Sequence, residues 1–145
     1  MVLASEDTLK ACKKCVLDEV RMVMGDPCPP IIIGVCMGGV ADYNLHLAKE
    51  ALFREPIGSH HPDPMIAQLE AELLEAVNAL GIGPMGFGGS TYAIAVHIEM
   101  AGKHTGVTPI GVTLDCWAHR YSKARIYMDG HVEYLTHPLG GEEDE

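Results

Sequence analysis

The cysteines are the side chains of this sequence with the widest chemical scope. They number five: Cys12, Cys15, Cys28, Cys36 and Cys116. An odd count does not complete a disulfide framework, so free thiols, a metal ion or an iron–sulfur cluster are the uses that remain open. Cys28 precedes Pro29-Pro30, and Cys116 follows the apolar run 110–114. Each alone is typical of buried packing, but at the ends of two strands they could meet on one side of a sheet.

A histidine and a C-x-x-C pair supply further candidates. His104 lies twelve positions before Cys116, in the loop that enters the same strand. Cys12 and Cys15 form the pair, which in redox proteins stands at a helix start beside a βαβ unit. Here both fall inside a predicted helix, and Cys12 lies on its apolar face, so packing is the favoured interpretation of Cys12. A zinc or thiol-redox protein using Cys12, Cys15 and Cys28 is the weaker alternative.

Two glycine-rich segments have spacings that resemble ligand-binding loops. Gly81, Gly83 and Gly86 match G-x-G-x-x-G, but a helix precedes them and a strand follows, the reverse of a dinucleotide site. They still allow a ligand to approach the backbone closely. Residues 34–39 have the order strand, glycine turn, helix, so that helix N-terminus would attract an anion such as a carboxylate. A tight packing turn explains the same residues equally well.

Hydrophobic periodicity predicts the elements that must position these groups. The predicted helices cover residues 5–24, about 14 residues from Val40, and Asp63 to about Leu80. The predicted strands cover 31–33, 92–98 and 110–114, followed by a short helix at 117–124 and a hairpin turning at Asp129–Gly130. The fold class is therefore mixed α/β: a small sheet flanked by helices, with a C-terminal β-hairpin. We assign residues 1–139 to one domain and 140–145 to a solvated acidic tail.

The charge balance excludes some classes of partner. Apolar residues make up 48% of the 145 and charged residues 21%, as in ordinary globular proteins, and the net charge is −10. An acidic chain lacks the basic face that nucleic acids and anionic membranes require. There is no apolar run long enough for a membrane span, and the start MVLASEDTLKACKK does not have the pattern of a signal peptide. We expect a cytoplasmic protein with reduced thiols.

Three long runs carry a family resemblance. They are CPPIIIGVCMGGVADYNLHLAKEAL, LGIGPMGFGGSTYAIAVHIE and KHTGVTPIGVTLDCWAHRYSKARI, which begin at residues 28, 80 and 103. In this order they resemble the oxygen-sensitive iron–sulfur hydro-lyases, the family of class I fumarases and L-tartrate dehydratases. The match runs from about residue 5 to residue 138 and corresponds to the C-terminal half of the family's α subunit or α-type domain.

The resemblance implies an activity and a set of site residues. The family holds a [4Fe–4S] cluster with three cysteines and reversibly adds or removes water from a hydroxy-dicarboxylate such as malate or tartrate. By this resemblance Cys28, in CPP, and Cys116, in DCWAHR, are two cluster ligands, and His104, in KHTG, contacts the substrate. The third ligand is implied to lie in an N-terminal α portion, and a β subunit is implied as a further partner.

Two questions stay open on the sequence alone. Cys36 stands where the family turn has glycine, so it is either a substitute third ligand or, more simply, a packing residue. The chain is either part of an enzyme or a truncated, non-catalytic module without a complete cluster. An α part cut in two would expose an apolar face, so we expect a homo-oligomer when the chain is alone.

Overall fold

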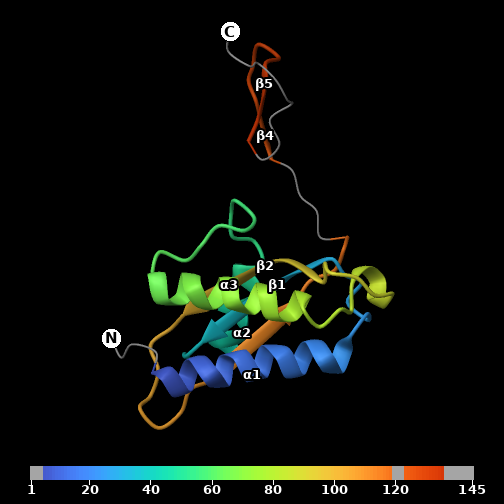
Figure 1. Cartoon of the computed structure of the whole chain (residues 1–145). Helices are drawn as coiled ribbons and strands as arrows, with labels where there is room; N and C mark the ends of the chain where they lie inside the picture. Colours follow the sequence, from blue (N-terminus) through green and yellow to red (C-terminus); the bar gives the residue numbers. More distant parts are fainter. Residues whose placement is uncertain (1–4, 119–122, 136–145) are drawn as a thin grey trace.

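The protein is described by a computed structural model over residues 5–118 and 123–135. Figure 1 shows a helical and sheet-containing body, with a hairpin lying away from it. The helices are α1 (Glu6–Val23), α2 (Ala41–Ala51) and α3 (Pro64–Asn78), with a 3₁₀ turn η1 (Pro84–Gly86). The strands are β1 (Ile31–Met37), β2 (Ala93–Met100), β3 (Ile110–Leu114), β4 (Ala124–Ile126) and β5 (Val132–Tyr134). The predicted mixed α/β fold class is confirmed, including the C-terminal hairpin.

The central sheet has the strand order β2-β1-β3. β1 pairs with β2 in parallel, with Ile33 opposite Val96, and with β3 in antiparallel, with Ile33 opposite Leu114. Consequently β1 and β2 both end where β3 begins. The other end of the sheet combines the start of β1, the start of β2 and the end of β3, and this is the end that carries the two candidate cysteines.

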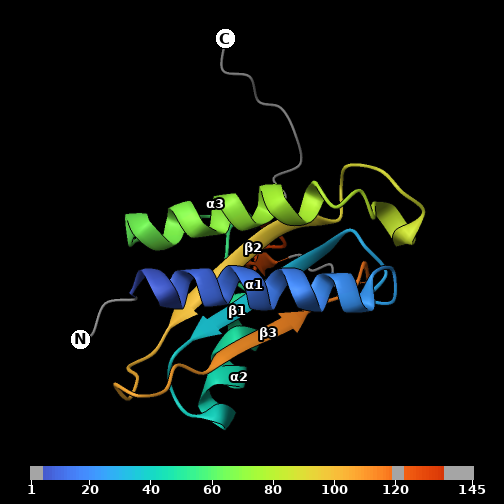
Figure 2. The same ribbon diagram turned by 60° about the horizontal axis from the view of Figure 1, so that its bottom comes forward.

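Helices cover both faces of this sheet (Figures 1 and 2). On one face α1 and α3 pack side by side, and their buried side chains share one apolar core with Ile31, Ile33 and Val35 of β1. On the other face α2 packs against β1, and Leu52 joins a smaller cluster with Ile32 and Ala95. Alternate residues of β1 point to opposite faces, so a continuous apolar strand is what a doubly covered sheet requires.

The starts and the buried faces of α1 and α3 agree with those that their sequences predict. The Ser5 side chain accepts a hydrogen bond from the Thr8 N–H at 3.3 Å and caps α1. Asp63 caps α3 in the same way through the Met65 N–H at 2.9 Å, and Pro64 occupies the first turn. In α1 the buried positions recur every four residues, which confirms the predicted apolar face that includes Cys12.

Three predicted boundaries are wrong or only partly described. Residues 34–37 belong to β1 rather than to a glycine turn, which is confined to Gly38 and Gly39. Gly34 is needed inside the strand because a Cβ there would lie 2.1 Å from the Ala48 carbonyl oxygen of α2. The short helix predicted after Cys116 is a turn at residues 117–118 and a strand from Ala124, and residues 119–122 lie outside the described part. The acidic tail 140–145 lies outside it too.

No described helix is both long and apolar enough to cross a membrane.

Candidate functional site

Cys28 and Cys116 lie on neighbouring segments at one end of the sheet. Beyond β3 the chain continues alongside β1: the Asp115 N–H donates to the Ile32 carbonyl at 3.3 Å, and the Ile32 N–H donates to Asp115 Oδ1 at 2.7 Å. One step further, the Trp117 N–H donates to the Cys28 carbonyl at 3.0 Å. Both cysteines are exposed. The expectation that they meet on one side of the sheet is therefore supported by the backbone hydrogen bonds that join their segments.

The backbone of Cys28 has an uncommon conformation that its neighbours hold in place. Its φ is +59°, in the left-handed region that costs a residue with a Cβ about 1–2 kcal/mol. The Cys28 N–H donates to the Gly25 carbonyl at 3.0 Å, while its own carbonyl accepts from Trp117. Such a conformation persists only where the surroundings fix it, and non-glycine residues of this kind gather at functional sites.

The two thiols have different hydrogen-bond partners. Cys116 Sγ accepts the Ala118 N–H at 3.2 Å. Cys28 Sγ donates to the Asp26 carbonyl at 3.7 Å, a contact that a thiol makes and a thiolate does not. An amide N–H directed at a cysteine sulfur stabilises the thiolate, and hydrogen bonds to sulfur are among the features that tune iron–sulfur centres.

The glycine-rich loop, residues 81–89, forms a third part of this end of the molecule. It follows α3 and precedes β2, so the order helix, loop, strand that argues against a dinucleotide site is confirmed. The Met85 N–H donates to the Pro29 carbonyl at 2.8 Å, which joins the loop to the residue after Cys28. Figure 2 shows the loop with η1 beside the C-terminal end of α1.

His104 lies at the opposite end of the sheet from the two cysteines. It is an exposed residue of the connection between β2 and β3, which begins and ends beside Met37 of β1. Between the Gly38–Pro109 and Ile32–Asp115 hydrogen bonds lie about six strand residues, roughly 20 Å. The structure therefore does not bring His104 together with Cys28 and Cys116 within this chain.

The other three cysteines are separate from the site. Cys36 is fully buried in β1, near the His104 end of the sheet, and burial, reinforced by Glu99, raises the pKa of its thiol to about 11. It is placed as a packing residue and not as a partner of Cys28. Burial also raises the pKa of Cys12 to about 12, so this thiol stays protonated, whereas metals and disulfides need the thiolate. Burial raises the pKa of Cys15 in the same direction.

No group of three or more His, Cys, Asp or Glu side chains among the described residues is arranged to hold a metal ion. Cys28 and Cys116 therefore do not form a complete metal site with other side chains of the described residues. Neither does the zinc alternative find a complete ligand set in residues 5–118 and 123–135.

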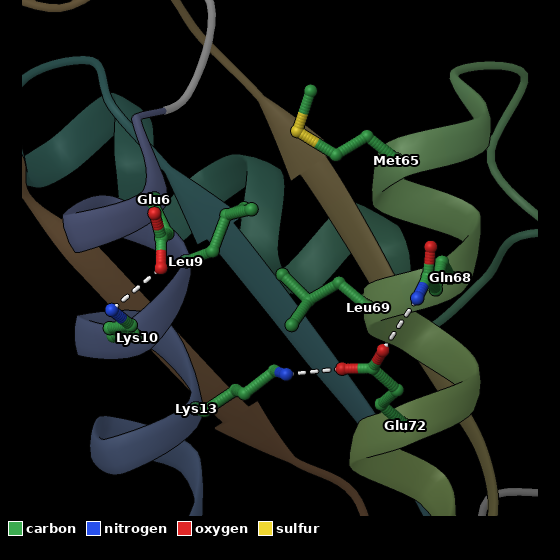
Figure 3. Close-up of a pocket in the computed structure, with 8 residues that line it drawn as sticks. All are labelled: Glu6, Leu9, Lys10, Lys13, Met65, Gln68, Leu69 and Glu72. Carbon is green, nitrogen blue, oxygen red and sulfur yellow. Dashed lines mark hydrogen bonds and ion pairs between the residues drawn. The ribbon is translucent and has the colours of Figure 1, made fainter.

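A pocket of about 230 Å³ lies between α1 and α3, away from Cys28 and Cys116 (Figure 3). Leu9 and Leu69 line its apolar part. Its charges are already paired, because Lys13 contacts Glu72 across the pocket and Lys10 contacts Glu6 at 2.7 Å. These ion pairs leave no unbalanced charge for a ligand, so the pocket is a groove between packed helices.

Sequence reasoning missed two features of the cysteine site. Asp115 directs its carboxylate to the start of β1, and Gly25 packs against Gly86 of the glycine-rich loop. The residue types gave a signal for neither, because a strand-end aspartate and a helix-end glycine usually have local roles. Only the pairing of segments more than fifty residues apart reveals them.

Comparisons with known proteins identify the relatives of this chain. Residues 1–125 match the family model described as Fumarate hydratase (Fumerase). A Methanocaldococcus jannaschii protein, provisionally named as an L(+)-tartrate dehydratase subunit alpha, is 48% identical over 131 residues, which are 90% of this chain and 46% of that protein. The L(+)-tartrate dehydratase subunit alpha of Escherichia coli strain K12 is 35% identical over 136 residues, 94% of this chain and 45% of the relative.

This chain thus spans slightly less than half the length of the curated relatives it matches. The family match, by contrast, covers most of the chain and includes both Cys28 and Cys116. The chain belongs to the fumarate hydratase (Fumerase) family, as an α-type domain of the class I fumarase and tartrate dehydratase kind.

Proposed function

We propose that this chain is part of a [4Fe–4S]-dependent hydro-lyase, of the fumarate hydratase or tartrate dehydratase type, in which Cys28 and Cys116 are two of the cluster ligands. The carrying observation is the Trp117-to-Cys28 hydrogen bond, which holds the two exposed cysteines on adjacent segments. The relatives named as tartrate dehydratase α subunits support the reaction class. The substrate would be a hydroxy-dicarboxylate, to which water is reversibly added or from which it is removed.

The chemistry of the donor set supports this cofactor. Thiolates are the preferred ligands of iron–sulfur clusters, and exposure leaves both sulfurs accessible. The Ala118 N–H donates a hydrogen bond to Cys116 Sγ, and the rigid Pro29-Pro30 segment limits the motion of Cys28. When bound, a cluster with one iron free of protein thiolate would supply a Lewis acid for the substrate hydroxyl and carboxylate.

The assembled enzyme requires more than this chain. We propose an N-terminal α portion that supplies the third ligand, and a β subunit, in keeping with relatives that are named as α subunits. His104 remains the proposed substrate contact on the strength of its motif. Because it lies at the far end of the sheet from Cys28, this contact requires a substrate site completed by another chain or another part of the protein. A reducing, cytoplasmic setting would keep the five free cysteines reduced.

Anaerobic reconstitution tests the proposed ligands. Iron and acid-labile sulfide are measured per chain for the wild type and for Cys28→Ser, Cys116→Ser and Cys15→Ser, in the complex that contains this chain. We expect each of the first two variants to lose at least tenfold in bound iron, because each removes a thiolate. Cys15→Ser, which alters a partly buried residue of α1, is the matched control and should bind iron normally. Unchanged iron in Cys28→Ser and Cys116→Ser would contradict the proposal.

A second candidate is a non-catalytic module without a complete cluster. It is favoured by the lack of a three-ligand set among the described residues. The same measurement separates the two, because stoichiometric iron and sulfide in an active complex excludes the module. A complex that binds no iron, yet assembles with this chain, would support it.

A further inference from the structure

The glycine-rich loop contacts the segment around Cys28, residues 25–29, at two points. Gly25 and Gly86 approach each other through their backbones: a Cβ on Gly25 would lie 3.0 Å from Gly86 Cα and 3.0 Å from the Met85 carbonyl oxygen. A Cβ on Gly86 would lie 2.9 Å from Gly25 Cα. A Cβ on Gly86 would be closer than side chains tolerate, and a Cβ on Gly25 would force the loop backbone to shift by a few tenths of an ångström.

The second point of contact lies on the other side of Cys28. The Met85 N–H donates to the Pro29 carbonyl at 2.8 Å, while the Cys28 N–H donates to the Gly25 carbonyl at 3.0 Å. The loop thus contacts the chain both before and after Cys28. The Trp117 N–H donates to the carbonyl of Cys28 itself. A cysteine with φ of +59° depends on such contacts, since nothing intrinsic to the residue favours that conformation.

We propose that the glycine-rich loop is the positioning element for Cys28, acting through the Gly25–Gly86 backbone contact and the Met85-to-Pro29 hydrogen bond. This inference rests on the proposed function, in which Cys28 and Cys116 bind iron together. The loop does not touch the metal. It sets the direction of the Cys28 side chain relative to Cys116, in the way that residues behind metal ligands commonly fix ligand geometry.

A two-thiolate metal probe measures this positioning without iron or activity. Cadmium is titrated into the purified metal-free chain, and its affinity is followed by the cadmium–thiolate absorbance, because a soft metal reports on paired thiolates. Four chains form a cycle: wild type, Gly25→Ala, Cys28→Ser and the double variant. Cys116→Ser is titrated beside them. Gly25 has no left-handed φ, so the added methyl tests only the close contact. Gly102→Ala is the control, because nothing lies within 4 Å of a Cβ there.

We expect Gly25→Ala to weaken cadmium binding about tenfold, as supporting residues of metal sites do, and Gly102→Ala to leave it unchanged. In the Cys28→Ser background, Gly25→Ala should change the affinity less than twofold, because residues that act through one another are not additive. An unchanged affinity in Gly25→Ala, or the same loss with and without Cys28, would overturn the positioning role.

The outcomes also separate this inference from the proposed function. If Cys28→Ser and Cys116→Ser bind cadmium as the wild type does, the cysteines are not a pair and both proposals fail. If those variants lose binding while Gly25→Ala does not, only the role of the loop fails.

A measurement on the unmodified chain tests the proposal without relying on the folding of a variant. Cadmium binding should slow amide hydrogen exchange at Met85 as well as at Trp117, because the two N–H groups hold adjacent carbonyls of the Cys28 segment. A Met85 amide that does not respond while Trp117 becomes protected would contradict the coupling.

Discussion

At the scale of the residue, the most consequential buried group outside the site is His97. It is fully buried in β2, and the Gly58 N–H donates to its Nε2 at 3.2 Å. Its Nδ1 lies 2.9 Å from the Ala51 carbonyl oxygen. A backbone N–H can only donate and a carbonyl can only accept, so His97 is the neutral tautomer with its proton on Nδ1. Protonating Nε2 would break the bond from Gly58.

This tautomer predicts a pH dependence of stability. Burial lowers the pKa of His97, and the Ala51 carbonyl, Glu70 and Glu99 oppose that shift only in part. Below about pH 6.5, His97 therefore takes up a proton in the unfolded chain but stays neutral in the folded chain. The contribution of His97 is present above that pH and is lost as the pH falls. Urea unfolding between pH 8 and pH 5.5 should show a steeper loss in the wild type than in His97→Gln. Parallel pH profiles would refute this assignment.

The residue scale also shows how far sequence reasoning reaches into the site. Cys28 and Cys116 could be predicted to meet because both flank apolar strands, and strand ends share an edge. That prediction holds only because β3 runs antiparallel to β1, a direction that no local pattern encodes. The separation of His104 from Cys116, by contrast, follows from their positions before and after the same strand. The left-handed backbone of Cys28 could not be predicted, since it is imposed by hydrogen bonds from distant segments.

At the scale of the element, side chains close the outer edge of β2. Glu70 of α3 is 2% exposed and accepts the Ile98 N–H at 2.8 Å, while Arg54 donates to the Ile98 carbonyl and pairs with Glu70 at 2.6 Å. Near the start of the strand, Asn78 accepts the Ala93 N–H at 2.9 Å and donates to the Ala93 carbonyl at 3.1 Å. These groups stand where a further strand would pair.

Arg54→Met is expected to destabilise the fold by about 3 kcal/mol, because it leaves the Glu70 carboxylate buried without its cation. The matched control is Lys13→Met, which removes an ion pair to Glu72 whose two side chains are about 40% exposed. That loss should be clearly smaller, because water screens the exposed charges. Free energies of unfolding from urea titrations measure both. Equal losses of unfolding free energy in the two variants would contradict the expectation that the buried ion pair contributes more to stability.

Element boundaries were predictable where periodicity alone determines them. The faces of α1 and α3 follow from apolar residues three or four apart, and β3 agrees with its predicted range 110–114. The prediction failed at Gly34, where a glycine resembles a turn but serves the close approach of α2. The glycine at position 34 is required by the packing of α2 on β1, and packing between distant elements cannot be predicted from the local sequence.

At the scale of the whole molecule, the chain exposes much apolar surface. The hairpin β4–β5 exposes Ile126, Met128 and Tyr134, and α2 exposes Tyr43 and Leu45. A two-stranded hairpin is marginal in water unless it packs against something. We expect the chain alone to be a homo-oligomer, which light scattering coupled to size exclusion would measure. A monodisperse monomer would contradict this expectation.

The two edges of the central sheet are unequal, and this limits what such an oligomer can become. In the described part of the chain β3 pairs only with β1, so its outer edge is open, whereas polar side chains occupy the edge of β2. A sheet with one unpaired edge can form hydrogen bonds with one other sheet. If the β3 strands of two chains pair in antiparallel, neither sheet keeps an unpaired β3 edge. Growth by strand pairing through the central sheet therefore stops at two chains, and its asymmetry disfavours open-ended stacking of that sheet.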